Sequence, residues 1–350
     1  MDKDKIIDYI ERSFLSSLLL DDDVTDISYN GVDFYYVSNS RGREKSDIIV
    51  DHQTVKDLLR QVANLTEQQF SYTNPNLDVS FGKYRLNATH QSIGRLNDEN
   101  VVTLSIRKAS DTPKITDRSG FLPKEIIELV NFIIKKRLSI VIGGITGTGK
   151  TEFQKYLIRK MPANERVIVI DNVMELDHTR SDTNIDLTCW QVDEKNENMS
   201  APILIKNALR NNPDWLIVSE ARDKEMIDVL NSALTGAPII TTVHSYDASS
   251  LPYRMARLIQ RNEQKMELDE ILDDLYYHFH FYFYLSKDDS NHHISRYLSE
   301  ILYIDNIGKK VSLFKNDGKD LKYSKLPKSA ISLLEIKDCS KGFKEKFIGG

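Results

Sequence analysis

The sequence predicts an α/β fold with a smaller α+β domain at its N-terminus. Its 350 residues exceed one average domain, and a hydrophobic content of 40% suffices for two cores. The pattern also changes near residue 120: before it, helical and strand-like segments are mixed, and after it wholly apolar runs alternate with helical segments. Such runs are typical of parallel strands covered by helices, so the second part is predicted to be α/β.

Composition excludes several classes of protein. The net charge of -5 and the isoelectric point near 6.0 disfavour a protein whose main role is to coat nucleic acid. No apolar run approaches the ~20 residues that span a bilayer, and the charged start is unlike a signal peptide, so we expect a cytoplasmic chain. Cys189 and Cys339 lie far apart without a CxxC motif, which excludes a zinc module and argues against a disulfide scaffold.

The elements expected before residue 109 follow from local patterns. Apolar residues at helical spacing predict helices over 6–18 and 55–65. Asn30-Gly31 separates two strand-like runs, which predicts a hairpin. The stretches at 84–90 and 101–108 are expected to form further strands. Residues 109–120, "ASDTPKITDRSG", are almost free of apolar side chains and are predicted to form a linker.

After the linker, "LPKEIIELVNFIIKKRL" is expected to be an amphipathic helix, and "SIVIGG", "RVIVID", "DWLIVSE" and "PIITTVH" are expected to be buried parallel strands. The aromatic run "YYHFHFYFYL" is interpreted as a buried strand, because no basic residue interleaves to suggest a nucleic-acid surface. The ending "KGFKEKFIGG" is expected to be a solvated terminus. The predicted domains are therefore 1–108, the linker 109–120, an α/β domain over 121–310 and a C-terminal extension over 311–350.

One motif points to chemistry. "GITGTGKT", Gly144 to Thr151, satisfies G-x-x-x-x-G-K-[ST] and lies between an apolar strand and a helical pattern, as a phosphate-binding loop requires. Its glycines turn backbone N–H groups toward phosphates, Lys150 is expected to reach the β- and γ-phosphates, and the Thr151 hydroxyl is expected to bind Mg²⁺. The predicted nucleotide-binding residues of the loop are Gly144, Thr146, Gly147, Thr148, Gly149, Lys150 and Thr151. No guanine-reading NKxD element is present, so nothing favours GTP over ATP.

Polar residues follow three other strands of the same half. Glu220 comes after the apolar residues 215–218, where a carboxylate can hold the metal or polarise water. Asp171 and Glu175 follow "VIVI", and His244 follows "IITTV". Two plainer interpretations stay open: Glu220 and Arg222 as a solvated ion pair, and His244 as a structural histidine.

Taken together, the motifs resemble those of the secretion (traffic) ATPases of type II and type IV secretion, type IV pili and Tad pili, especially the CpaF-like branch. "LRNNPDWLIVSEARD" resembles their Walker B signature, with Ser219 in place of the usual glycine. "VIDNVMEL" resembles their acidic box, with Asn172 where aspartate is common, and "TTVHSYDA" resembles their histidine box, with Ala237 upstream where many members have histidine. "DDDVTDISYNGVDFYYV", "NPNLDVSFGKYRLNATH" and "VTLSIRK" resemble the N-terminal motifs, so the likeness covers about residues 20–305.

The resemblance implies an N-terminal α+β domain, a RecA-like ATPase domain and a homohexameric ring that binds ATP and Mg²⁺ between the two domains. It implies that Glu220 supports the metal or the attacking water, that Glu175 is a candidate base and that His244 senses the γ-phosphate. Four arginines would neutralise charge during phosphoryl transfer: Arg210, Arg222, Arg85 and Arg107.

The leading hypothesis is an ATPase motor, peripheral at the inner face of the cell membrane, that powers a secretion, pilus or conjugation machine. Its expected partners are copies of itself and a membrane-embedded platform protein, and nucleic acid is not expected to be a direct ligand. One alternative is a DNA-translocating RecA-like ATPase. Another is an ATP-binding scaffold with little turnover, in which the departures at Asn172 and Ala237 have disabled hydrolysis.

Overall fold

The computed structural model of the chain describes residues 3–110, 112–177, 179, 183–193, 196–223, 225–262, 266–288 and 294–349. The chain divides into two units. The first comprises Met1–Thr112 and Asp288–Ser295, and the second comprises Pro113–Lys287 and Arg296–Gly350. The chain therefore passes between the units three times, the first time within the segment 109–120.

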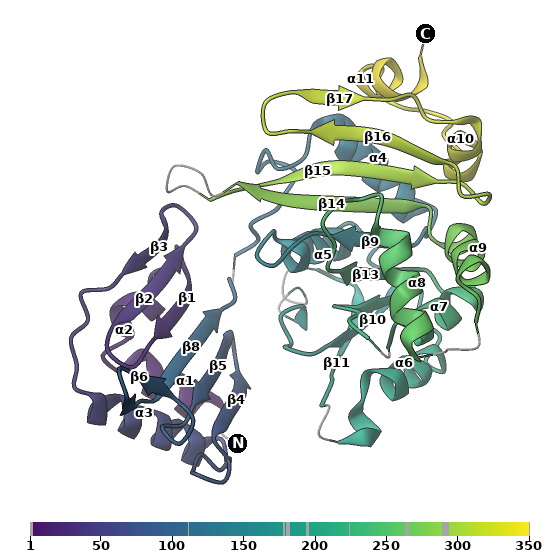
Figure 1. Cartoon of the computed structure of the whole chain (residues 1–350). Coiled ribbons are helices and arrows are strands. Elements are labelled where there is room, and N and C mark those ends of the chain that lie inside the picture. The colour runs from purple at the N-terminus through teal and green to yellow at the C-terminus, as the bar shows by residue number, and fades with distance from the viewer. Residues whose placement is uncertain are drawn as a thin grey trace. The chain divides into compact units, whose positions relative to one another are not determined.

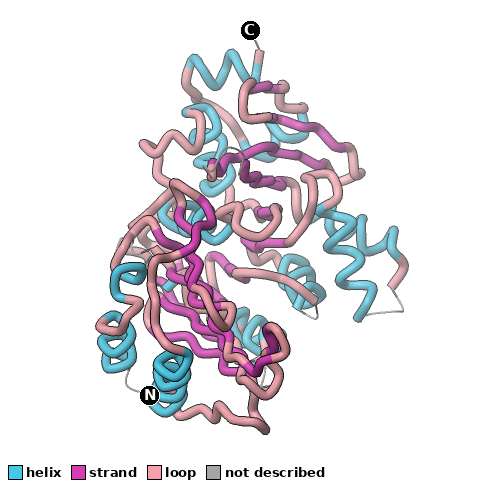
Figure 2. The backbone as a smooth tube through the Cα atoms, turned by 60° about the vertical axis from the view of Figure 1, so that its left-hand side comes forward, coloured by secondary structure: helices cyan, strands magenta, loops and turns pink. Residues whose placement is uncertain are grey.

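The first unit is a six-stranded antiparallel sheet with helices on one face (Figures 1 and 2). The strands lie in the order β3-β2-β1-β8-β5-β4, and β6 and β7 form a separate two-stranded sheet. The core side chains come from one face of this sheet and from α1, α2 and α3. The strands are β1 (Val24–Tyr29), β2 (Phe34–Ser38), β3 (Gly42–Lys45), β4 (Asn76–Phe81), β5 (Tyr84–Thr89), β6 (Arg95–Leu96), β7 (Glu99–Asn100) and β8 (Thr103–Lys108); the helices are α1 (Lys3–Glu11), α2 (Ser16–Leu19) and α3 (His52–Leu65).

The predicted hairpin at Asn30-Gly31 is confirmed, because β1 and β2 pair antiparallel on either side of it. The Asn30 side chain accepts hydrogen bonds from the N–H groups of Val32 and Asp33, at 2.9 and 2.8 Å, and stabilises the turn. The prediction of one helix over 6–18 is wrong. The Ser13 hydroxyl donates a hydrogen bond to Ile10 O and accepts one from the N–H of Leu15. A turn therefore replaces the helix between α1 and α2.

The second unit is built on a nine-stranded sheet in the order β11-β10-β12-β13-β9-β14-β15-β16-β17. The pairs from β11 to β14 are parallel, whereas β15, β16 and β17 pair antiparallel. The parallel strands are β9 (Ile140–Gly143), β10 (Arg166–Asp171), β11 (Asp186–Gln191), β12 (Trp215–Val218), β13 (Ile239–Val243) and β14 (Phe281–Asp288); the others are β15 (Ser295–Ile304), β16 (Lys310–Asn316) and β17 (Leu321–Tyr323).

Helices cover both faces of this sheet, as the wholly apolar strands predicted (Figure 1). Along β9, Ile140 and Ile142 belong to one core and Val141 to the other, which is the alternation expected of a strand. One core contains α4 (Lys124–Lys135), α5 (Lys150–Arg159), α10 (Lys328–Leu334) and α11 (Lys341–Phe343). The other contains α6 (Ala201–Leu209), α7 (Glu225–Leu234), α8 (Leu251–Asn262) and α9 (Leu268–His278).

Two predictions about the C-terminal part have different outcomes. The aromatic run does enter a buried strand: Phe281 to Leu285 are buried in β14, although the start of the run completes α9. The solvated terminus is wrong, because Phe343 and Phe347 are fully buried in the core that contains α4. Two aromatic side chains at this spacing form an apolar face that outweighs the lysines between them. Among the described residues, no helix combines the length and the apolar character needed to cross a bilayer.

Candidate active site

The phosphate-loop motif forms the connection between β9 and α5. Gly144, Gly147 and Gly149 have φ angles of 152°, 80° and 92°, a region that residues with a side chain rarely adopt. A Cβ atom on Gly144 would lie 2.6 Å from both Leu285 O and Thr148 Oγ1. Gly149 precedes the first residue of α5, so the loop ends at a helix N-terminus, where backbone N–H groups can receive an anion.

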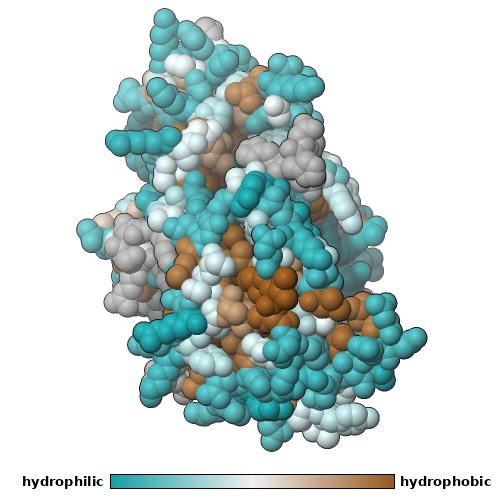
Figure 3. Space-filling model, turned by 90° about the vertical axis from the view of Figure 1, so that its left-hand side faces the viewer, coloured by the Kyte–Doolittle hydropathy of each residue, from teal (hydrophilic) through white to brown (hydrophobic). Residues whose placement is uncertain are grey.

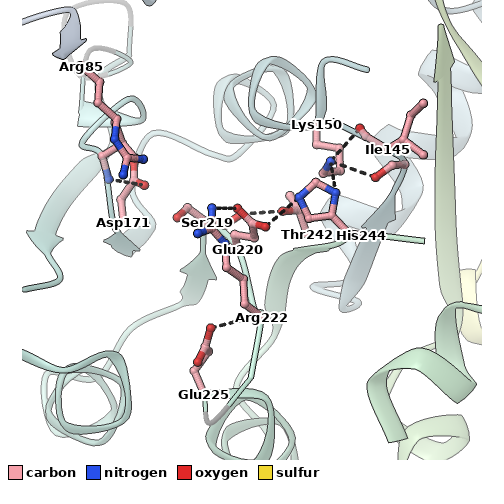
Figure 4. A network of polar contacts seen from close by, with 12 residues as sticks. Arg85, Ile145, Lys150, Asp171, Ser219, Glu220, Arg222, Glu225, Thr242 and His244 are labelled. Atoms are coloured by element: carbon pink, nitrogen blue, oxygen red, sulfur yellow. Dashed lines mark hydrogen bonds and ion pairs between the residues drawn. The ribbon is translucent and has the colours of Figure 1, made fainter. Parts of the chain in front are cut away.

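Lys150 lies inside this loop. Its side chain is buried, and its Nζ donates to Gly144 O at 2.9 Å and to Ile145 O at 3.0 Å (Figure 4). Burial lowers the pKa of Lys150 to about 8, although the nearby Glu220 carboxylate opposes this shift. A buried ammonium group whose hydrogen-bond acceptors are all neutral is well placed to gain an anionic partner.

Glu220 lies two residues beyond the end of β12 and is mostly buried. Arg222 donates to its Oε2 at 2.6 Å. Burial alone raises the pKa of Glu220, but the hydrogen bond and charge of Arg222 outweigh it, so the net pKa is lowered and the group is a carboxylate. Its Oε1 is buried, and its contact among the described residues is the His244 ring, 2.9 Å away.

His244 connects the two groups. Its Nε2 lies 2.9 Å from Glu220 Oε1, and its Nδ1 lies 3.4 Å from Lys150 Nζ (Figure 4). Because an ammonium group can only donate, Nδ1 is the acceptor and Nε2 carries the proton that faces Glu220. Burial, and then the charge of Lys150, lower the pKa of His244, which favours this neutral form.

Sheet order explains why these residues meet. β12, β13 and β9 are adjacent and parallel, so the residues after their carboxyl ends share one edge of the sheet. Thr242 Oγ1 also donates to Ser219 O at 2.8 Å and joins the ends of β13 and β12. Glu175 follows β10, the next strand along, and its N–H donates to the Asp171 carboxylate at 2.9 Å.

The three other predicted arginines have partners of their own or lie on other elements. Arg210 follows α6, and the next residue, Asn211, accepts a hydrogen bond from Arg166 at the start of β10. Arg210 therefore lies at the amino-terminal edge of the sheet, and the structure does not bring it to the cluster. Arg85 and Arg107 belong to the first unit, where they are cross-strand partners on β5 and β8 and are ion-paired with Asp78 and Asp26.

The structure adds residues that the motifs did not indicate. A pocket of about 360 Å³ is lined by Glu220, Arg222 and His244 and also by Arg254 of α8. Gln154, one helical turn after Lys150, is fully buried and donates to Val218 O at 3.4 Å. The spacing of four residues between Lys150 and Gln154 places them on the same face of α5 and is a signal that the sequence did contain.

The donor set fits Mg²⁺ bound together with a phosphate ligand. Within the described part of the chain, no three His, Cys, Asp or Glu side chains form a cluster that could hold a metal. Mg²⁺ needs no such cluster, because it usually keeps several waters and binds through one or two carboxylates plus phosphate oxygens. The buried Oε1 of Glu220 is an acceptor suited to a metal-bound water, and Thr151 supplies a hydroxyl in the first turn of α5.

Comparison with known proteins identifies the family. Residues 87–273, more than half of the chain, match the family described as type II/IV secretion system protein. An uncharacterized protein of Bacillus anthracis is 29% identical over 77% of this chain and 63% of its own length. The type IV secretion system protein VirB11 of Bartonella quintana is 32% identical over 45% of this chain and 44% of its own. This chain thus spans less than two thirds of either relative.

A solved structure, the ATPase DotB of Legionella pneumophila, matches with a TM-score of 0.61 at 21% identity, over 84% of this chain and 78% of its own. The likeness confirms the predicted fold class, α/β with a RecA-like P-loop domain and a smaller N-terminal domain. The matched range, residues 87–273, includes the phosphate loop and the residues after β12 and β13. The chain therefore belongs to the family of type II/IV secretion system proteins.

Proposed function

We propose that this chain is an ATP-hydrolysing motor that powers a secretion, pilus or conjugation machine. The observation that carries the proposal is the convergence of Lys150, His244 and Glu220 beside a phosphate-binding loop. Membership of the family supports it, as do the names of two similar proteins, a type IV secretion system protein and an ATPase. Within the family, the CpaF-like branch stays a prediction.

Each residue has a role in this proposal. Lys150 and the loop amides bind the triphosphate, and Thr151 and Glu220 hold Mg²⁺, which supplies neutralising charge at the phosphates. Glu220 also orients the attacking water, and His244 senses the γ-phosphate. The other proposed contributors are Thr146, Thr148, Glu175, Arg222, Arg85 and Arg107; Arg210, at the amino-terminal edge of the sheet, is not among them.

We propose two domains, over residues 1–108 and 121–310, with a linker over 109–120 and a C-terminal extension over 311–350. We also propose that the chain forms a hexameric ring. This ring would lie in the cytoplasm, peripheral at the membrane and docked on a membrane-embedded platform. One face of the molecule carries a group of apolar side chains among hydrophilic ones, in brown in Figure 3. Exposed apolar patches often mark protein–protein contacts, so this face supports assembly with copies or partners.

The first test is steady-state ATP hydrolysis by the purified chain, with and without single-stranded DNA. The proposal expects Mg²⁺-dependent turnover that DNA does not change. Lys150→Ala should abolish nucleotide binding, whereas Glu220→Gln should bind ATP and lose about 10²–10³-fold in kcat, the effect of removing a group that acts at the transition state. An exposed substitution, Lys322→Ala, is the control.

Other outcomes separate the alternatives. Strong stimulation by DNA would favour a DNA-translocating ATPase. Tight ATP binding without turnover, even at high protein concentration, would favour the scaffold and point to Asn172 and Ala237. If Glu220→Gln hydrolysed ATP at the wild-type rate, the role assigned to Glu220 would be wrong.

A further inference from the structure

An arginine that belongs to none of the motifs contacts the phosphate loop. Arg296, the second residue of β15, donates from Nε to Gly147 O at 2.8 Å. Its Cδ lies 3.8 Å from the position that a Cβ on Gly149 would occupy. Arg296 therefore lies along the outside of the loop from Gly147 to Gly149, although 149 residues separate it from Gly147 in the chain.

The contact fixes the orientation of one peptide group. In a trans peptide the C=O and the following N–H point in opposite directions. Since the Gly147 carbonyl points to Arg296, the N–H of Thr148 points away from Arg296. In loops of this motif, the backbone N–H groups bind the α- and β-phosphates, which are the phosphates nearest the nucleoside.

Thr148 is fully buried and its Oγ1 donates to Ile145 O at 2.9 Å, so the contact with Arg296 acts on the Gly147 side of this peptide. Apart from its two neighbours in the chain, no described residue lies within 4 Å of the position of a Cβ on Gly147, so the apex of the loop is not held by packing there. Gly147 also has a φ of 80°, and glycine has more freedom to leave such a conformation than any other residue. A charge-assisted hydrogen bond from a rigid guanidinium restricts that freedom.

We propose that Arg296 is a positioning residue of the nucleotide site, which holds the Gly147–Thr148 peptide so that the Thr148 amide faces the α- and β-phosphates. The proposal rests on the proposed function, because it assumes that the loop binds a nucleotide. Arg296 is also the first residue of the second unit after Asp288–Ser295, so the contact anchors the chain where it returns from the first unit.

The test compares nucleotide affinity in the full chain, with fluorescent ADP and ATP analogues and Mg²⁺, for Arg296→Ala and Arg296→Gln. Arg166 offers a matched control. It begins β10 in the same sheet, and its guanidinium also donates to a backbone carbonyl, that of Asn211 at 3.1 Å, but at the opposite edge. Arg166→Gln therefore removes a similar contact away from the loop. Circular dichroism and thermal unfolding establish that each variant is folded.

We expect Arg296→Ala to weaken ADP and ATP binding alike, by about tenfold, the effect of one charge-assisted hydrogen bond. Arg296→Gln should recover part of the affinity, because its amide can donate to the same carbonyl. In steady state, KM should rise while kcat at saturating ATP stays within about twofold, since the contact positions the loop in all states. Arg166→Gln should bind both nucleotides as the wild type does.

Three results would overturn the proposal. They are unchanged affinity in Arg296→Ala, an equal loss in Arg166→Gln, and a loss for ATP without a loss for ADP, which would indicate a contact with the γ-phosphate instead. If the folded wild type bound neither nucleotide, the proposed function would fail and this proposal with it. If the wild type bound both and Arg296→Ala did too, only the role of Arg296 would be wrong.

Discussion

Gly144 and Gly147 both have positive φ angles, but their surroundings differ. A Cβ on Gly144 meets a backbone oxygen and a buried hydroxyl at 2.6 Å, whereas a Cβ on Gly147 has no other described residue beyond its chain neighbours within 4 Å. We therefore expect Gly144→Ala to abolish nucleotide binding and to lower the melting temperature. Gly147→Ala should cost only the strain of its φ, about 1–2 kcal/mol. Nucleotide titration and thermal unfolding measure both effects, and equal loss in the two variants would contradict this account of the loop.

At the scale of residues, local motifs could be predicted and long-range partners could not. Lys150, Glu220 and His244 each follow an apolar strand, and parallel strand ends share an edge, so their meeting was predictable from the sequence. Arg254 and Arg296 are ordinary arginines in their own segments. Only the packing of α8 and β15 brings them to the site, and no local pattern encodes that packing.

At the scale of elements, the last aromatic residues hold the C-terminal segment on the second unit. Phe347 is fully buried, with its ring centroid 4.9 Å from that of Phe343, and Phe343 lies 5.4 Å from Phe132 of α4. We expect Phe347→Ala to lower the free energy of unfolding by about 3–5 kcal/mol, the usual cost of truncating a buried aromatic side chain. The exposed neighbour Lys344→Ala should change it by less than about 0.5 kcal/mol. Urea denaturation measures both.

His280, at the junction of α9 and β14, is expected to make the free energy of unfolding depend on pH. Burial lowers its pKa, although its hydrogen bond to Ile304 O opposes the shift; the neighbouring His278 lowers the pKa further and Asp305 raises it. A base with a lowered pKa in the folded state stabilises the fold above its unfolded pKa of about 6.5 and loses that contribution as pH falls. We expect the free energy of unfolding to decline between pH 7 and pH 5.5, and to decline less in His280→Asn. Parallel slopes in the two proteins would exclude this role.

The sequence predicted the strands that are buried on both faces of the sheet. It did not predict the elements whose presence or ends depend on local polar residues. The parallel strands of the second unit are apolar throughout, so their sequence alone identifies them. The break between α1 and α2 depends on the hydroxyl of Ser13, and the short strand β3 consists of Gly42 and charged residues, a composition that does not distinguish a strand from a loop.

At the scale of the molecule, the segment just after the first unit is tied to α5. Asp117 accepts hydrogen bonds from Tyr156 at 2.9 Å and from Lys160 at 2.5 Å. We expect Asp117→Ala to speed tryptic cleavage after Lys114 and Arg118 by at least about tenfold, because both hydrogen bonds to the carboxylate are lost and local opening becomes easier. Intact-mass analysis of timed digests measures it.

The matched variant is Asp57→Ala, which removes an exposed aspartate paired with Arg60 on α3. It should leave the rate of cleavage at Lys114 and Arg118 unchanged. Equal rates in Asp117→Ala and the wild type would mean that this contact does not hold the segment on α5.

The return of the chain to the first unit limits how the protein can be divided. Asp288–Ser295 groups with Met1–Thr112, so a gene cut between codons 112 and 113 would leave part of the first unit encoded on the second fragment. A fragment of residues 1–112 expressed alone would lack its neighbours from that distant segment. The first unit should therefore be studied by fragment complementation, in which the two fragments are produced in the same cell and supply all of its residues.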